Sequence, residues 1–117
     1  MEFFIRQSST KPVLKLKLID DGKNDKSSFN DLLETSTITF DMIDVKNGEH
    51  QILNAPCNIT TLTKKFNYTT DEYYIVYQFT ESDTSVKGRF EGIVTIVFED
   101  NNKLIVPIRE KLYINVI

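Results

Sequence analysis

Residues that could carry chemistry are few in this sequence, and their spacing does not build a site. His50 is the only histidine and stands beside an Asn-Gly turn, with no cysteine or carboxylate at ligand spacing and no nucleophile near it, so we expect an exposed turn residue. Cys57 is the only cysteine, which excludes an intrachain disulfide and favours a mostly buried reduced thiol. Neither residue predicts catalysis.

A second candidate is the acidic stretch that begins at Asp20-Asp21-Gly22 and resembles a calcium loop superficially. The glycine follows the first aspartate by two positions instead of five, and no glutamate closes the loop at the twelfth position. We therefore expect a solvated turn. The remaining carboxylates lie in turns or alternate outward on strands, and no Gly-rich phosphate loop is present. The sequence predicts a protein without catalytic residues, metal or cofactor, and thus not an enzyme.

Length, charge and composition limit the classes of molecule that this protein is expected to bind. The 117 residues and 13.6 kDa suit a single domain, 1–117, able to bury roughly two thirds of its unfolded surface. The net charge is -3 and the lysines are scattered, so we expect no nucleic-acid partner. No segment approaches the roughly 20 apolar residues of a membrane span, and the N-terminus has no signal-peptide pattern. We expect no membrane partner, no small-molecule substrate, and synthesis in a cytoplasm.

The sequence predicts mainly β-strands, and the central pair, at 73–79 and 90–98, would position the side chains of any binding surface. Residues 73–79 alternate, with Tyr73 and Tyr77 on one face and Tyr74 on the other. Residues 90–98 are apolar on both faces, so this second strand must be covered on both sides. Between the two strands, Asp83-Thr84 and a later glycine supply the parts of a corner that carries the chain from one sheet to the other.

Shorter patterns predict the remaining elements. Lys15 and Lys17 alternate outward on an edge strand that follows Pro12, and the Asn47-Gly48 pair favours a type I′ hairpin turn. The sequence predicts seven to nine strands of an antiparallel β-sandwich with one short helix. These further features are expected: strands at 3–6, 13–20, 37–43, 51–53, 57–63, 104–106 and 112–117; a helix at 27–34; a break at 54–56; a loop at 64–71; a hairpin turn at 99–102; and a bulge or sheet crossing at Pro107.

The order of these motifs resembles that of a known family. The first half contains Pro12, the Asp-Asp-Gly turn at 20–22, and the strand with its Asn-Gly turn at 37–48. The second half contains Tyr77-Gln78-Phe79, Asp83-Thr84, Gly88-Arg89-Phe90, the stretch VFEDN at 97–101 and the closing LYINV. The chain resembles the immunoglobulin-like N-terminal domain of phage baseplate upper proteins and short virion structural proteins of crAss-like tailed phages. The resemblance implies an immunoglobulin-like β-sandwich that catalyses nothing and docks onto other virion proteins. Family members commonly continue into a helical trimerising stalk and a receptor-binding tip, so the resemblance implies neither oligomerisation nor host recognition for residues 1–117.

Three functions follow as hypotheses. The first is a non-catalytic bacteriophage virion protein, an auxiliary or decoration protein bound to the major capsid protein. The second is a tail, neck or baseplate adaptor that anchors fibres, and the third is a carbohydrate-binding module, which the tyrosines permit and the absence of tryptophan opposes. Tyr74, Val76 and Phe98 could instead be covered by the protein's own loops, including Phe66 and Tyr68. The expected protein-interface residues are Tyr73, Tyr74, Tyr77, Asp83, Thr84 and Arg89.

Overall fold

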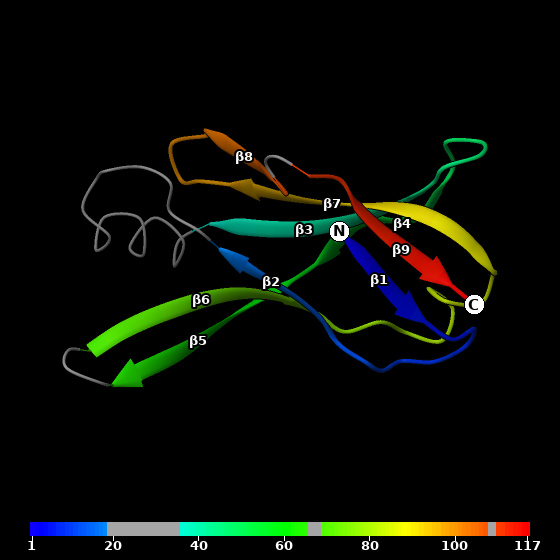
Figure 1. Cartoon of the computed structure of the whole chain (residues 1–117). Helices are drawn as coiled ribbons and strands as arrows, with labels where there is room; N and C mark the ends of the chain where they lie inside the picture. The colour runs from blue at the N-terminus through cyan, green and yellow to red at the C-terminus, as the bar shows by residue number, and fades with distance from the viewer. Residues whose placement is uncertain (19–35, 66–68, 108–109) are drawn as a thin grey trace.

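The computed structural model describes residues 1–18, 36–65, 69–107 and 110–117, and for residues 18, 60–65 and 69–73 it describes the backbone only. The described chain forms strands that make up two facing sheets (Figure 1). The predicted helix at 27–34 lies outside the described residues. In the part of the chain that is described, no helix is long and apolar enough to cross a membrane. The strands are β1 (Glu2–Ile5), β2 (Leu14–Leu18), β3 (Thr37–Asp44), β4 (His50–Pro56), β5 (Asn58–Lys65), β6 (Thr69–Tyr77), β7 (Gly88–Val97), β8 (Lys103–Val106) and β9 (Leu112–Val116).

One sheet, which we call the large sheet, has six strands in the order β1-β9-β7-β3-β4, with β8 also pairing β7. The other, the small sheet, has three in the order β2-β6-β5. The two central strands of the sequence therefore belong to different sheets, β6 to the small and β7 to the large, as the polar corner between them predicted. The β-sandwich is confirmed, and so is the edge position of β2, whose exposed Lys15 and Lys17 discourage pairing with another chain.

Every second side chain along the strands points inward, and these side chains fill the space between the two sheets. Ile38, Phe40 and Met42 of β3 point inward, as the sequence predicted, and meet the inward residues of β6 and the segment after it. The ring of Phe40 lies 4.7 Å from that of Tyr77 and 6.2 Å from that of Phe79, measured between ring centroids. These contacts join the two sheets through one aromatic cluster.

The β3–β4 hairpin differs from the predicted type I′ turn. That turn needs positive φ at both central residues, but here Gly48 has φ 73 while Asn47 is not among the residues with positive φ. The loop is longer, closed by a hydrogen bond from the Asp44 N–H to the Glu49 carbonyl oxygen (2.8 Å). The side-chain oxygen of Asn47 accepts from the Glu49 N–H (2.8 Å), so this asparagine stabilises the loop with its side chain.

The predicted break at 54–56 is wrong, because β4 continues to Pro56 through an irregularity in its pairing with β3. Asn54 takes φ 53, and its N–H donates to the carboxylate of Asp41 (2.5 Å). This arrangement absorbs the extra residue as a β-bulge. Cys57 then carries the chain from the large sheet to the small one, with its N–H bonded to the carbonyl oxygen of Ile38 (3.0 Å).

Two further boundaries differ from expectation. The loop predicted at 64–71 is mostly strand, since β5 and β6 pair as far as Lys65 opposite Thr69. Backbone pairing extends this hairpin through a polar stretch whose sequence has no apolar alternation. Of the two alternatives expected at Pro107, the sheet crossing is wrong, because β8 and β9 both pair antiparallel with β7, one after the other. The interruption between them lies within one sheet, as the bulge alternative requires. The 99–102 turn is confirmed, with the Phe98 N–H bonded to the Asn102 carbonyl oxygen (2.8 Å).

Candidate protein-contact surfaces

The corner between β6 and β7 is held by hydrogen bonds among its own residues. The Asp83 carboxylate accepts from the Tyr77 hydroxyl (2.7 Å) and from the Thr80 N–H (2.8 Å). The Thr84 hydroxyl donates to the Ser9 carbonyl oxygen (2.8 Å), which ties the corner to the segment after β1. Burial, reinforced by the hydrogen bond and the charge of Asp83, raises the pKa of Tyr77 well above its usual range. The hydroxyl therefore stays protonated and serves as a donor.

This burial corrects part of the expected interface. Tyr77 is 7% exposed and Thr84 0%, so neither can reach a partner protein. Asp83 is half-buried and already engaged, and the side chain of Tyr73 lies outside the described residues. These residue types fit a corner as well as an interface, because a hydroxyl paired with a carboxylate lets polar groups be buried. The corner fastens the two sheets together.

The exposed sides of the two sheets are different. We call the outer side of the small sheet the small-sheet face; its described side chains are Lys15, Lys17, Asn58, Tyr74 and Val76. Lys15 lies opposite Val76 and Lys17 opposite Tyr74, so cations and apolar groups sit side by side across β2 and β6. Tyr74 and Val76 are half-buried. The alternative in which Phe66 and Tyr68 cover them falls on residues outside the description.

We call the outer side of the large sheet the large-sheet face, and define it by Phe4, Arg89, Glu91, Ile93, Ile105 and Tyr113. Register places these residues on four adjoining strands: Tyr113 of β9 is opposite Glu91 of β7, while Ile105 of β8 is opposite Thr95. Phe4 and Ile105 are each 57% exposed. Of the expected interface residues, only Arg89 lies on this face.

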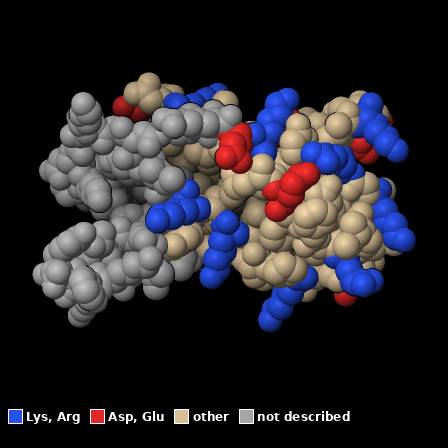
Figure 2. Space-filling model, viewed as in Figure 1, with Lys and Arg blue, Asp and Glu red and all other residues tan. Residues whose placement is uncertain are grey.

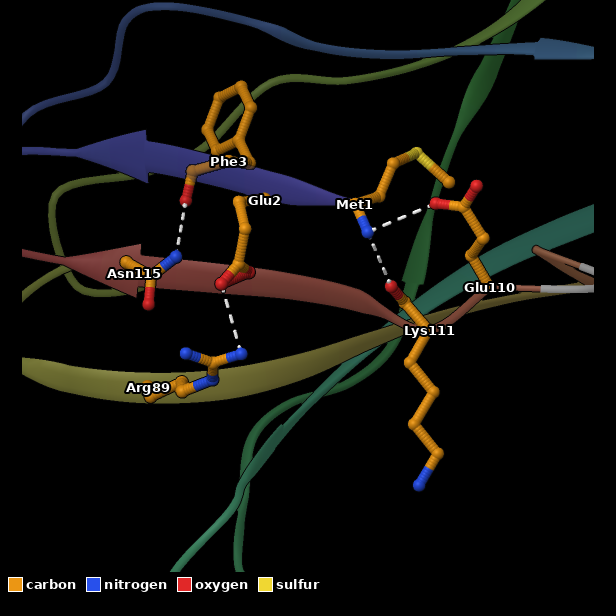
Figure 3. Close-up of polar contacts among 7 residues, drawn as sticks. All are labelled: Met1, Glu2, Phe3, Arg89, Glu110, Lys111 and Asn115. Carbon is orange, nitrogen blue, oxygen red and sulfur yellow. Dashed lines mark hydrogen bonds and ion pairs between the residues drawn. The ribbon is translucent and has the colours of Figure 1, made fainter.

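Ion pairs and a stacked cation order the polar groups of the large-sheet face. The Arg89 guanidinium lies 2.9 Å from the Glu2 carboxylate and 4.0 Å from the centroid of the Tyr113 ring. Lys111 lies 3.7 Å from the carboxylate of Glu91. Figure 3 shows the Glu2 and Arg89 side chains reaching toward each other from β1 and β7. The guanidinium is thus held between a carboxylate and an aromatic ring.

The same region fastens β1 to β9. The Met1 amino group lies 3.2 Å from the Glu110 carboxylate and donates to the Lys111 carbonyl oxygen (3.1 Å), while the Asn115 side-chain amide donates to the Phe3 carbonyl oxygen (3.3 Å) (Figure 3). These contacts span residues more than a hundred positions apart in the sequence. They hold β1 in its parallel pairing with β9, and so keep Phe4 on the large-sheet face.

The residues that could have carried chemistry, Cys57 and His50, lie in surroundings that do not activate them. Burial, and then the nearby charge of Asp41, raises the pKa of Cys57 from 9.0 to about 12, which leaves its thiol a poor nucleophile at neutral pH. His50 is exposed. Among the described residues, no group of three or more His, Cys, Asp or Glu side chains could hold a metal ion. Lys and Arg side chains are spread among uncharged residues on the face seen in Figure 2.

Sequence reasoning missed Phe4, Ile105 and Tyr113. A signal was present for two of them: Phe3 and Phe4 are consecutive, so one of them must point outward, and Leu104-Ile105-Val106 has the same property. The sequence does not show the strand pairing, in which β8 and β9 pair with β7 and β1 pairs with β9, that places these residues on one face. No family model, curated protein or solved structure matches this chain.

Proposed function

We propose that this chain is a non-catalytic virion structural protein of a tailed phage, an auxiliary protein attached to the capsid. The observation that carries the proposal is the strand order. Strands β2-β6-β5 face β9-β7-β3-β4, which is the arrangement of strands B-E-D and G-F-C-C′ in a variable-type immunoglobulin domain. This strand order supports the immunoglobulin-like fold that the resemblance to phage virion proteins implies, so topology and motif order favour the same family.

The small-sheet face is the surface that we propose for attachment. It presents the exposed Lys15 beside the half-buried Val76, which offers charged and apolar contacts side by side to a partner protein with acidic groups. Tyr74 lies between Lys17 and the β5 edge, and tyrosine is enriched at protein interfaces because it is rigid and amphipathic. A capsid lattice holds many copies in register, so modest contact area for each copy suffices.

Co-sedimentation tests the proposal. The purified chain is mixed with emptied heads of the phage that encodes it and, separately, with its tails. We expect binding to heads, and a loss of binding with Tyr74→Asp, which places a carboxylate on the proposed contact. Val86→Asp is the matched control, because Val86 is 51% exposed in the segment before β7 and belongs to neither sheet face.

The outcomes separate the hypotheses. Binding to tails alone would replace the capsid assignment by the adaptor function. Binding to neither heads nor tails would contradict a virion function. Binding that survives Tyr74→Asp but is lost with Val86→Asp would retain the virion function and move the contact away from the small-sheet face.

A further inference from the structure

We infer that the large-sheet face packs against the same face of a second copy, forming a two-fold symmetric dimer. This dimer goes beyond the proposed virion function, and neither depends on the other. The first observation is apolar exposure. Phe4 and Ile105 are each 57% exposed and Ile117, directly after β9, is 56% exposed, whereas Ile93 at the middle of the face is half-buried. Burying such side chains is the main favourable term in association.

The second observation concerns charge, which decides between a second copy and a different protein. A two-fold interface places one patch against itself, so a patch with an excess of either sign repels its copy. On the large-sheet face each central cation is already paired within the chain, Arg89 with Glu2 and Lys111 with Glu91. Asp41 of β3 and Lys103 of β8 also point outward and add one charge of each sign. The face therefore has no excess of either sign and is compatible with its own copy.

The third observation is size and shape. The six strands of the large sheet have four to ten residues each, so at about 3.3 Å along a strand and about 4.8 Å between strands the sheet covers about 600 Å². That is the lower end of the area, about 600–1,000 Å², that each partner contributes to a stable specific interface. Two copies of one sheet also share the same twist, so they can pack face to face at the angle of about 30° seen between aligned sheets.

The centre of this contact has the composition of an interface core. Arg89 stacked on Tyr113 presents a planar guanidinium and an aromatic ring with little freedom to lose on binding. Phe4, reached through β9, lies beside this pair, and Ile105 of β8 lies farther along the same side of β7, because β3 pairs with the other side. Docking thus buries apolar groups around an already paired cation, and leaves no new unpaired charge.

Light scattering after size-exclusion chromatography tests the dimer over a range of concentrations. We expect a mass twice the 13.6 kDa of one chain that falls toward 13.6 kDa on dilution. Phe4→Asp and Ile105→Asp each place an unpaired carboxylate in the contact, and should raise the dimer dissociation constant tenfold or more, roughly the effect of one hot-spot residue. Lys15→Asp on the small-sheet face is the control and should leave the dimer intact.

A charge swap sharpens the result. Arg89→Glu leaves two adjacent carboxylates on the face and should weaken the dimer, whereas the double change Arg89→Glu with Glu2→Arg restores a neutral pair and should recover part of the affinity. A circular dichroism melt checks that each variant is folded. A wild-type monomer at all concentrations, or a dimer lost with Lys15→Asp but kept with Phe4→Asp and Ile105→Asp, would overturn the inference. Binding to emptied heads is measured separately and bears only on the virion function.

Discussion

The outer faces of the two sheets rest on one shared core but differ in the exposure of their apolar side chains. On the large-sheet face, Phe4 and Ile105 are each 57% exposed, and the nearby cations Arg89 and Lys111 lie within ion pairs. On the small-sheet face, Tyr74 and Val76 are half-buried opposite Lys17 and Lys15. Exposed apolar groups among balanced charges can be buried against a second copy. Apolar exposure and charge balance therefore favour self-association at the large-sheet face, and we propose a different partner for the small-sheet face.

The largest expected effect is on the stability of the whole sandwich, because unfolding would destroy both outer faces. Phe40 is 0% exposed and its ring contacts those of Tyr77 and Phe79, so it joins the sheets. Phe40→Ala should lower the free energy of unfolding by about 3–5 kcal/mol, through lost burial and the cavity left behind. Urea denaturation measures this change. A loss below about 1 kcal/mol would show that the two sheets are held together without this aromatic cluster.

A smaller effect is expected at the corner that fixes one sheet relative to the other. Tyr77→Phe removes the hydroxyl that donates to the Asp83 carboxylate, and should cost about 1.5–3 kcal/mol, the usual range for a hydrogen bond to a charged group. Tyr113→Phe makes the same chemical change on the large-sheet face and is the control, expected within about 0.5 kcal/mol. Equal losses in the two variants would contradict a structural role for the corner.

A change at Arg89 should separate folding from association. Its ion pair with Glu2 joins side chains that are 50% and 40% exposed, so Arg89→Ala should cost about 1 kcal/mol or less in unfolding free energy. The dimer should weaken more than the fold does. Arg89→Lys keeps the charge but loses the planar stacking on Tyr113, and should fall between wild type and Arg89→Ala in dimer affinity.

The smallest effect on stability at neutral pH concerns Cys57, where the chain passes between the sheets, because its contribution changes only at alkaline pH. Its pKa in the folded protein is about 12 against 9.0 ordinarily, so the folded thiol should react with iodoacetamide about a thousandfold more slowly than in the unfolded chain. The unfolded chain loses this proton first as pH rises. The thiol's contribution to stability is therefore complete below pH 9 and is lost between pH 9 and about 12. In Cys57→Ala, the free energy of unfolding measured by urea denaturation should fall less between pH 9 and about 12 than in the wild type. An equal fall in both proteins would contradict a contribution of this thiol to stability.

Local patterns predicted the strands well because alternation decides which side of a strand is buried. The inward set of Ile38, Phe40 and Met42 followed directly from period-two hydrophobicity. Turn details were less accessible. At Asn47-Gly48 a competing side-chain hydrogen bond favours a longer loop, and at Asn54 a bulge continues a strand that the sequence reads as broken.

The candidate surfaces were harder to predict, because they depend on pairing between distant segments. Tyr77 has the residue type of an interface but is buried by Phe40, which precedes it by more than thirty positions in the chain. Phe4, Ile105 and Tyr113 form one face only through the pairing of β1, β8 and β9 around β7. Alternation places each side chain on a face of its strand, while strand order decides which side chains become neighbours.

The central claim is that the two faces have different partners, and a crossed comparison tests it most directly. Phe4→Asp and Tyr74→Asp are each assayed for mass by light scattering and for co-sedimentation with emptied phage heads, beside the wild-type chain. The account predicts that Phe4→Asp is a monomer that still binds heads, while Tyr74→Asp is a dimer that does not. A single variant that loses both activities while remaining folded would contradict the assignment of separate partners to the two faces.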